Sequence, residues 1–350
     1  MLFRFEKIYG IFFLLNDNEY QIRWEDIMNK LFRLLTVTAL ASLMLVGCSG
    51  RSAETVKQSE SETSKTLEKK EYTYKDVAGR ETVFKEAPKK VAISYLPHWE
   101  TLVMLDVMPI ATVSAKHYAA TWDPFKGRDF SSIADLGTNS TTINLELLAQ
   151  LEPDVILHQV SDPTKLNIEN LEKIAPVVVF GEQVKMDWRF ALRELGAAVG
   201  KSQKAEEVIT DINKKLADSK VKLQKDYKDK TVMLMSLMGK DRYFIAYRPD
   251  LFDKEKGLGL NSPQGYPTSE SYTQISMESI VKMNPDYIFV SSFDGDEALF
   301  EELSNNSVWK SLNAVKAGHV YTLDGAGHAA SVMSTVHTVD FMIDKLLSNK

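Results

Sequence analysis

Short apolar runs recur along most of this chain and are separated by longer stretches with helical spacing of apolar and polar residues. Continuous apolar runs of this length are typical of parallel strands that are buried on both faces. The predicted strands cover residues 90–94, 110–114, 155–158, 177–180, 232–237, 287–291 and 320–323. Because helical patterns alternate with these strands, the pattern predicts an α/β fold rather than a helical bundle.

The longest helical pattern covers residues 202–228, in the middle of the chain. Ser202 is a suitable N-cap, and Glu206 and Glu207 follow in the first turns, where acidic side chains are favoured. The apolar positions form one stripe: Ala205, Val208, Ile209, Ile212, Leu216 and Leu223. A coiled-coil dimer is the alternative, but the stripe is too short for several heptads. We therefore expect a single helix that bridges two lobes and limits their relative motion.

A segment of 15 residues occurs twice, first from Ile143 and again from Ile275, which lies 132 residues later. The two copies are INLELLAQLEPDVIL and ISMESIVKMNPDYIF, which share Ile, Glu, Pro, Asp and Ile at five aligned positions. Each copy predicts a short helix with an outward Glu, a Pro-Asp break and then an apolar strand. The spacing is too long for a solenoid, whose periods are roughly 20–50 residues. The repeat therefore predicts two similar α/β lobes with a cleft between them.

The N-terminal region has the pattern of an export signal. Residues 28–33 form a short basic region with Lys30 and Arg33, residues 34–46 are mostly apolar, and the stretch ends in Leu45-Val46-Gly47-Cys48. An apolar stretch of this length is short for a membrane span, which needs about 20 residues, but fits a signal peptide. Its end is similar to a bacterial lipobox, whose Cys becomes lipidated. The alternatives are a buried free thiol or a membrane segment that ends at this Cys, the single cysteine in the chain.

These patterns divide the chain into six regions. Residues 1–27 fit no signal peptide, so we expect either an upstream extension that precedes a start at Met28 or a translated extension that stays disordered. Residues 49–70 are Ser-, Glu-, Lys- and Thr-rich, which predicts a flexible tether. The expected regions are the extension (1–27), the signal peptide (28–47), the lipidated Cys48 with its tether (48–70), the N-terminal lobe (71–198), the bridging helix (199–228) and the C-terminal lobe (229–350).

Several motifs together resemble one class of proteins. They are the signal with its lipobox, the strand at 89–93, Asp135-Leu-Gly137, the two repeat copies, residues 174–178 and the segment 309–321. The class is the helix-bridged substrate-binding proteins of ABC importers for ferric siderophores, haem and cobalamin. The resemblance covers about residue 72 to the C-terminus. It implies two Rossmann-like lobes joined by a single long helix, as in class III periplasmic-binding proteins.

In such a fold the ligand lies where loops leave the carboxyl ends of strands in both lobes. Aromatic and cationic residues alternate in these loops, which also contain Trp122 and Arg248, and this mixture suits a bulky chelate with apolar faces and exposed oxygens. The predicted ligand-binding residues are Tyr95, His98, Trp99, Lys116, His117, Tyr118, Trp188, Arg189, Arg242, Tyr243, Tyr247 and His328. Each of them has a plainer interpretation as rim packing or as part of a solvated helix face.

Other functions find little support in the sequence. The net charge of −6 gives no sign of nucleic-acid binding, and there is no P-loop, nucleophile elbow or dinucleotide fingerprint, so we expect no enzyme, no catalytic residues and no cofactor. The six His show no close metal-ligand spacing, so we expect no metal site, although ligands from distant loops stay open.

We therefore expect a monomeric, lipid-anchored binding protein on the extracytoplasmic face of a Gram-positive cell membrane. It captures a ferric siderophore and delivers it to an ABC permease with its ATPase. Haem or a corrinoid in the same fold, and a surface adhesin or sensor, are the alternatives. In the class that this chain resembles, glutamates at the positions of Glu146 and Glu278 dock onto permease arginines, and both acids are present here. The plainer interpretation of both is an acid at a helix start.

Overall fold

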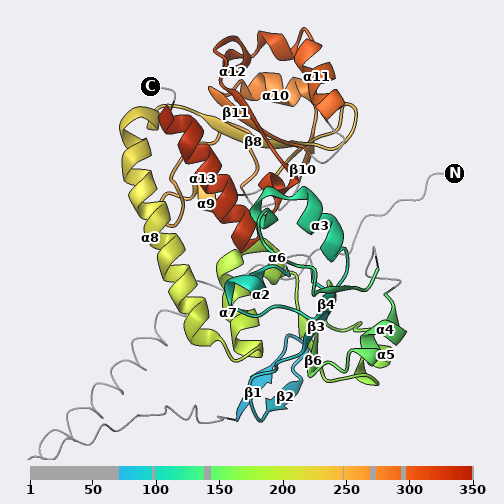
Figure 1. The fold of residues 1–350 in the computed structure, drawn as a ribbon. Helices are drawn as coiled ribbons and strands as arrows, with labels where there is room; N and C mark the ends of the chain where they lie inside the picture. The colour runs from blue at the N-terminus through green and yellow to red at the C-terminus, as the bar shows by residue number, and fades with distance from the viewer. Residues whose placement is uncertain are drawn as a thin grey trace, which may run out of the picture. The chain divides into compact units, whose positions relative to one another are not determined.

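The computed structural model describes residues 71–96, 99–137, 143–246, 248–268, 273–292 and 297–348, without the side chains of Tyr118, Glu297 and His328. Two five-stranded sheets form the centres of two lobes (Figure 1). Each sheet has an apolar core on both faces, because alternate residues of its strands point to opposite sides. In β11, for example, Phe289 lies in one cluster while Ile288 and Val290 lie in another.

The N-terminal lobe has a parallel sheet with the strand order β5-β4-β3-β6-β7. Its strands are β3 (Val91–Tyr95), β4 (Ala111–Thr112), β5 (Ala134–Asp135), β6 (Val155–Gln159) and β7 (Val177–Phe180). Its helices are α2 (Thr101–Met104), α3 (Ala115–Thr121), η1 (Asp123–Phe125), α4 (Leu145–Gln150), α5 (Glu169–Glu172), α6 (Gln183–Met186) and α7 (Trp188–Ala198). The order reverses direction between β3 and β6, where doubly wound folds bind ligands.

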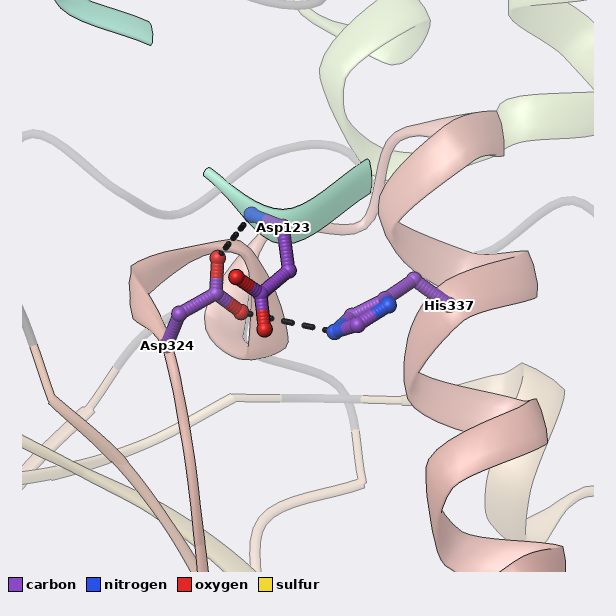
Figure 2. A group of neighbouring side chains, drawn as sticks. All are labelled: Asp123, Asp324 and His337. Atoms are coloured by element: carbon purple, nitrogen blue, oxygen red, sulfur yellow. Dashed lines mark hydrogen bonds and ion pairs between the residues drawn. The ribbon is translucent and has the colours of Figure 1, made fainter. Parts of the chain in front are cut away.

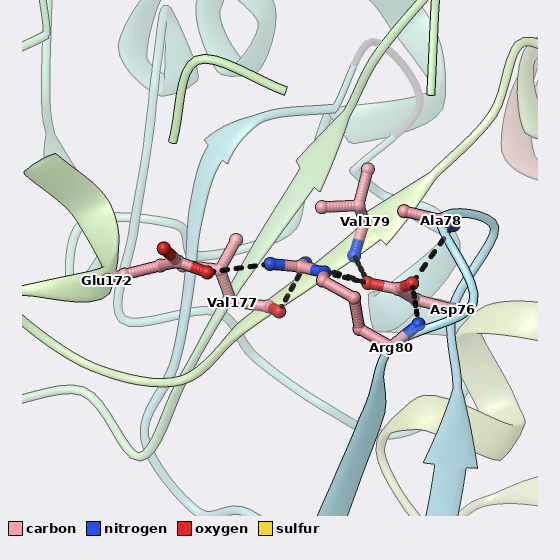
Figure 3. Close-up of polar contacts among 6 residues, drawn as sticks. All are labelled: Asp76, Ala78, Arg80, Glu172, Val177 and Val179. Carbon is pink, nitrogen blue, oxygen red and sulfur yellow. Dashed lines mark hydrogen bonds and ion pairs between the residues drawn. The ribbon is translucent and has the colours of Figure 1, made fainter. Parts of the chain in front are cut away.

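A hairpin of β1 (Tyr72–Lys75) and β2 (Glu81–Phe84) is held against β7, the edge strand of this sheet. The nearly buried Asp76 carboxylate accepts hydrogen bonds from the backbone N–H groups of Ala78 and Arg80 and from the Arg80 guanidinium, at 2.7–3.0 Å. Arg80 also donates to the Val177 carbonyl at 2.9 Å and pairs with Glu172 at 2.7 Å (Figure 3). The hairpin therefore covers an edge that would otherwise expose unpaired backbone groups.

The C-terminal lobe has a mixed sheet with the order β10-β9-β8-β11-β12, in which β8, β11 and β12 are parallel and β9 and β10 are antiparallel. Its strands are β8 (Val232–Leu237), β9 (Tyr243–Ile245), β10 (Thr273–Ile275), β11 (Tyr287–Ser292) and β12 (Val320–Leu323). Its helices are α9 (Pro249–Phe252), α10 (Met277–Met283), α11 (Glu297–Asn305), η2 (Trp309–Ser311), α12 (Asn313–Lys316), η3 (Gly325–His328) and α13 (Val332–Ser348).

A single helix, α8 (Ser202–Tyr227), connects the lobes as predicted. All six residues of the predicted stripe are buried, and α8 packs against α7 at one end and α13 at the other (Figure 1). The helices α7 and α8 approach closely at Gly196, where an added Cβ would lie 2.9 Å from the Cβ of Ala205. The prediction of Ser202 as the N-cap is wrong, because Lys201 occupies that position without a side-chain cap.

The C-terminal helix α13 also contacts the N-terminal lobe, at α2, η1 and α7. It is joined to α8 by an ion pair between Lys215 and Asp340 and by a hydrogen bond from the Tyr227 hydroxyl to the Leu346 carbonyl. Two helices, α8 and α13, therefore connect the lobes by packing, although one of them connects them in sequence. Within the described residues, no helix has the length and apolar character that crossing a bilayer requires.

Candidate functional site

A cavity of about 890 Å³ lies between the lobes, beside the bridging helix. Its wall comes from α6, the first half of α7, the middle of α8, the segment 249–257 around α9, and Ala330. Two of the predicted ligand-binding residues, Trp188 and Arg189, line it. Cavities of roughly 300–1,000 Å³ hold drug-sized ligands, so this one has a suitable size for a chelate.

Asp187 fixes the positions of Trp188 and Arg189 at the start of α7. Its carboxylate caps the helix by accepting hydrogen bonds from the backbone N–H groups of Arg189, at 2.8 Å, and Phe190, at 3.3 Å. The Arg189 guanidinium lies over the Trp188 ring, 4.1 Å from its centroid, which is close enough for a cation–π contact. A short polar cap therefore places an aromatic ring and a cation together at the cavity wall.

The Arg189 guanidinium joins three segments of the chain. It donates to Asn213 Oδ1 on α8 at 2.7 and 2.9 Å and to the Lys256 carbonyl at 2.8 Å. Burial lowers the pKa of Arg189, and the carboxylates of Asp187, Asp250 and Asp253 oppose that shift. Because its hydrogen-bond acceptors here are neutral oxygens, Arg189 brings positive charge to the cavity wall.

Trp188 carries a donor that lacks a partner. Its side chain is 4% exposed, and among the described residues no acceptor lies in hydrogen-bond reach of Nε1. A buried N–H without an acceptor costs about 1–3 kcal/mol, so such groups usually bind a water molecule or a ligand atom. The protein therefore leaves a hydrogen-bond donor unused at the cavity wall, although Nε1 itself is shielded from solvent in this arrangement.

Nearby, Arg248 is not a free cation for a ligand. It is completely buried, pairs with Asp250 at 2.6 Å and donates to the Gly327 carbonyl at 2.7 Å. The pair holds the start of α9 against η3, behind the cavity wall. The interpretation of Arg248 as a cleft residue is therefore replaced by a structural one.

The other predicted ligand-binding residues lie apart from this cavity. Trp99 is 2% exposed and packs against Phe125 and Phe130 in the core of the N-terminal lobe, which gives it a packing role in this arrangement. Trp122 stacks on the same Phe125. Tyr95 is half-buried at the end of β3, with its ring centroid 6.4 Å from that of His158.

Lys116 and His117 are exposed on α3. In the C-terminal lobe, Arg242 is exposed over the Phe244 ring, and Tyr243 is buried on β9, with its hydroxyl donating to Asp241 at 3.2 Å. His98, Tyr247 and the side chains of Tyr118 and His328 lie outside what the structure describes. The ligand-binding roles of all these residues stay predictions.

Sequence reasoning placed Gln159 and Ser161 in a loop at the end of a strand but missed Glu182, which joins them in a polar network at the carboxyl ends of β6 and β7. Glu182 accepts hydrogen bonds from Gln159 Nε2, at 3.1 Å, and from the Ser161 hydroxyl, and it forms an ion pair with Lys185. Burial opposes the ionisation of Glu182, but these three donors together lower its pKa. Gln159 and Ser161 are more than 20 residues from Glu182, so no local motif links them. The one sequence signal for this network is that its residues follow the predicted ends of neighbouring strands.

The two acids of the repeat occupy matching positions. Glu146 and Glu278 are each the second residue of a short helix, behind the N-caps Asn144 and Ser276, and both are exposed. Each cap accepts a hydrogen bond from a backbone N–H one turn into its helix, at 2.9 and 3.2 Å. The repeat therefore presents one carboxylate from each lobe to solvent.

Comparison with known proteins identifies the family. The model of the family described as "Periplasmic binding protein" matches residues 95–326, which is well over half of the chain. The chain belongs to the periplasmic binding protein family. All of the cavity lining except Ala330 falls within the matched residues, so the cavity belongs to the region that defines the family.

Relatives of this periplasmic binding protein match about four fifths of its length or more. The iron(3+)-hydroxamate-binding protein FhuD of Bacillus subtilis is 30% identical over 309 residues, which are 85% of this chain and 89% of FhuD. The probable siderophore-binding lipoprotein YfiY of the same organism is 29% identical over 311 residues, 85% of this chain and 91% of YfiY. The crystal structure of Staphylococcus aureus SirA complexed with staphyloferrin B has a TM-score of 0.64 at 25% identity, and the match covers 79% of this chain and 98% of SirA. These matches agree with the predicted helix-bridged, two-lobe fold.

Proposed function

We propose that this periplasmic binding protein captures a ferric siderophore outside the cell and delivers it to an ABC permease with its ATPase. The observation that carries the proposal is a pair of side chains in the wall of the interlobe cavity: the Trp188 indole, whose N–H has no partner among the described residues, and the Arg189 guanidinium. Both point to a ligand rich in acceptor oxygens.

A ferric siderophore has the matching chemistry. Its own oxygens saturate the iron, so the protein need grip only the organic shell, by apolar contact, aromatic faces and hydrogen bonds to oxygens. The cavity offers such contacts through Trp188, Leu216 and Met186, with Arg189 and Arg193 at its wall. Arg193 already forms an ion pair with Glu206 at 2.6 Å. Arg189 is therefore the better candidate for binding a negatively charged group of the ligand.

The names of the relatives support this class of ligand. FhuD is named for ferric hydroxamates, YfiY for siderophores, and SirA was crystallised with staphyloferrin B. These ligands differ in chemistry but share a ferric centre in an oxygen-donor shell.

The remaining parts of the proposal concern the anchor and the permease. Residues 28–47 act as a signal peptide, and Cys48 carries the lipid that holds the protein, as a monomer, on the extracytoplasmic face of the membrane. These residues lie outside the described part of the chain. Glu146 and Glu278 dock the loaded protein onto the permease.

A ligand screen tests the proposal. Protein purified from its native host should show the broad charge-transfer band of a ferric hydroxamate or catecholate, or should acquire it on titration with ferric siderophores. Binding should quench tryptophan fluorescence, and Trp188→Phe should remove much of the quenching because Trp99 and Trp122 lie in the core. A Soret band, or binding of haem or a corrinoid with no response to siderophores, would contradict the proposal.

A further inference from the structure

Three side chains from distant segments meet at the junction of the two lobes. Asp123 belongs to η1 of the N-terminal lobe, Asp324 lies between β12 and η3 of the C-terminal lobe, and His337 lies on α13 (Figure 2). One ligand atom from each lies within 4.8 Å of the other two. The two aspartates are 201 residues apart in sequence, so no local motif announces this group.

Backbone contacts hold the group in place. Asp324 Oδ2 accepts a hydrogen bond of 2.7 Å from the backbone N–H of Asp123, which fixes one lobe to the other at this point. The Ser291 hydroxyl, on β11 of the C-terminal lobe, donates to the Asp324 backbone carbonyl at 2.7 Å and so holds Asp324 within that lobe. The position of the Asp324 carboxylate is therefore set before any ligand arrives.

The atoms that face each other are not satisfied by the protein. Asp324 Oδ1 and His337 Nε2 are shielded from solvent, and within the described residues neither has a hydrogen-bond partner. They lie 3.5 Å apart, farther than an ordinary hydrogen bond. Two buried lone-pair atoms that face each other across such a gap are stabilised by a cation bound to both.

The charges at the junction lead to the same conclusion. Two carboxylates approach each other here, and like charges in a partly buried place repel unless a cation lies between them. Lys126 pairs with Asp123 Oδ1 and compensates part of this charge, but one carboxylate oxygen of each aspartate still lies beside the imidazole. Two carboxylate oxygens and one imidazole nitrogen are ligands that zinc and similar divalent metals accept.

We propose that Asp123, Asp324 and His337 bind a divalent transition-metal ion such as Zn²⁺, which joins the two lobes. One ligand comes from the N-terminal lobe and two come from the C-terminal lobe, so the bound ion adds a direct link where η1 meets α13. The site is separate from the Trp188–Arg189 cavity, whose lining includes none of the three residues. It therefore does not depend on the identity of the transported ligand.

Metal titration of the untagged chain tests the site. After treatment with EDTA and dialysis, the protein should bind one equivalent of Co²⁺, with the visible d–d absorption of Co²⁺ bound to nitrogen and oxygen ligands, and Zn²⁺ should displace it. Asp324→Asn and His337→Gln should each weaken binding by about 100-fold, because loss of even an outer-shell partner costs about 10–100-fold. Asp340→Asn is the matched control, since Asp340 lies on the same helix and pairs with Lys215 instead.

A melting experiment distinguishes loss of metal binding from a general loss of stability in the variants. Zn²⁺ should raise the melting temperature of the unmodified protein above its own EDTA baseline, because an ion that binds only the folded state stabilises it. The rise should disappear in Asp324→Asn, His337→Gln and Asp123→Asn, whatever their baselines. Binding only at millimolar metal would overturn the site, and so would a Co²⁺ spectrum and a melting shift that persist in all three variants. In either case the contact of Asp324 with His337 is an ion pair alone.

Discussion

Asp154 and Asp286 make the same contact in the two lobes: each carboxylate accepts hydrogen bonds from residues just before the neighbouring parallel strand. Asp154 Oδ2 accepts from the backbone N–H groups of Lys89 and Lys90 at 2.7 and 2.8 Å. Asp286 Oδ2 accepts from the backbone N–H and the hydroxyl of Thr231 at 2.8 and 3.0 Å. The aspartates of the repeat therefore align β6 with β3 and β11 with β8.

We predict that Asp154→Ala and Asp286→Ala each lower the free energy of unfolding, because each leaves backbone donors without an acceptor. The loss should be about 1–2 kcal/mol, the size expected for hydrogen bonds to a charged group near the surface. Asp286→Ala should cost more, since Asp286 is less exposed than Asp154. Urea unfolding followed by circular dichroism measures both.

Asp229→Ala is the control for this pair. Asp229 lies two residues before Thr231, but its side chain is 84% exposed and is 3.9 Å from Lys228. Its loss should change stability little. If Asp154→Ala and Asp286→Ala match this control, the repeated aspartates do not hold the strands.

The parallel strands of four or more residues follow from the sequence, while most of the shorter strands do not. The strands predicted at 177–180, 232–237 and 320–323 have the bounds that the structure shows. The first two are buried at every position, as continuous apolar runs predict. The hairpin β1–β2 was missed because each of its short strands buries one residue, Tyr74 or Phe84, and so contains no continuous apolar run. The strands β5, β9 and β10 are two or three residues long, too short for a periodic signal.

The sites were less predictable, because their residues meet only through tertiary contacts. Trp188 and Arg189 were found as aromatic and cationic neighbours in one loop. The partners of Arg189, Asn213 and the Lys256 carbonyl, are 24 and 67 residues away. Trp99 is 2% exposed and packs in the core, and composition alone does not distinguish a ring in the core from a ring at the rim.

We predict that Arg189→Ala weakens the binding of an anionic ferric siderophore by about 10–100-fold, the equivalent of a charge-assisted hydrogen bond. The binding of a neutral ferric hydroxamate should fall much less, because Arg189 is a positive charge at the cavity wall whose own acceptors are neutral oxygens. Fluorescence titration with one complex of each kind measures the difference.

Arg193→Ala provides the comparison for Arg189. It removes the same side chain from the same helix, but its charge is already paired with Glu206. Because Arg189 also joins α7 to α8, the melting temperature of each variant must be measured alongside its affinity. If Arg189→Ala lowers the affinity for anionic and neutral complexes equally, Arg189 does not discriminate between ligands by their charge.

Glu100 should make stability depend on pH. It is 2% exposed where α2 meets α13, and burial raises its pKa to about 7, against a smaller opposing effect of a hydrogen bond with Ser331. Between its ordinary value of 4.5 and about 7, the folded state holds this proton and the unfolded state does not. The free energy of unfolding should therefore fall as the pH rises through this window, by at most about 3 kcal/mol.

Glu100→Gln keeps the shape of the side chain but cannot ionise, so it should lack this component. The variant should resemble the unmodified protein near pH 5 and exceed it in stability at pH 8. Glu301→Gln, at an exposed position of α11, controls for the loss of one negative charge. Parallel curves for Glu100→Gln and the unmodified protein would show that Glu100 does not titrate in this range.

Processing of the N-terminus gives a prediction about location. Cys48→Ala should leave the signal peptide uncleaved or release the protein from the membrane fraction, because the lipid would have no attachment site. Fractionation and mass spectrometry of the mature N-terminus measure this. Unchanged processing and membrane retention in the variant would contradict the lipid anchor.

The exposed acids Glu146 and Glu278 should act in delivery rather than in ligand binding. Each follows a cap on a short helix, and a hydrogen bond with Ser276 lowers the pKa of Glu278, so this acid is ionised near neutral pH. Exposed ion pairs are individually weak, but two at a fixed separation orient a partner and speed encounter. Glu146→Ala combined with Glu278→Ala should therefore abolish siderophore uptake by cells.

The double variant should keep its ligand affinity and its melting temperature, because neither side chain lines the interlobe cavity. A control that replaces Glu169 and Glu301, which are also exposed, removes the same charge from other surfaces and should transport normally. Normal transport by the Glu146/Glu278 variant would reduce both acids to helix-start residues that contribute a few tenths of a kcal/mol each. Loss of ligand affinity would instead place them at the binding site, which their matched positions on the outer helices α4 and α10 argue against.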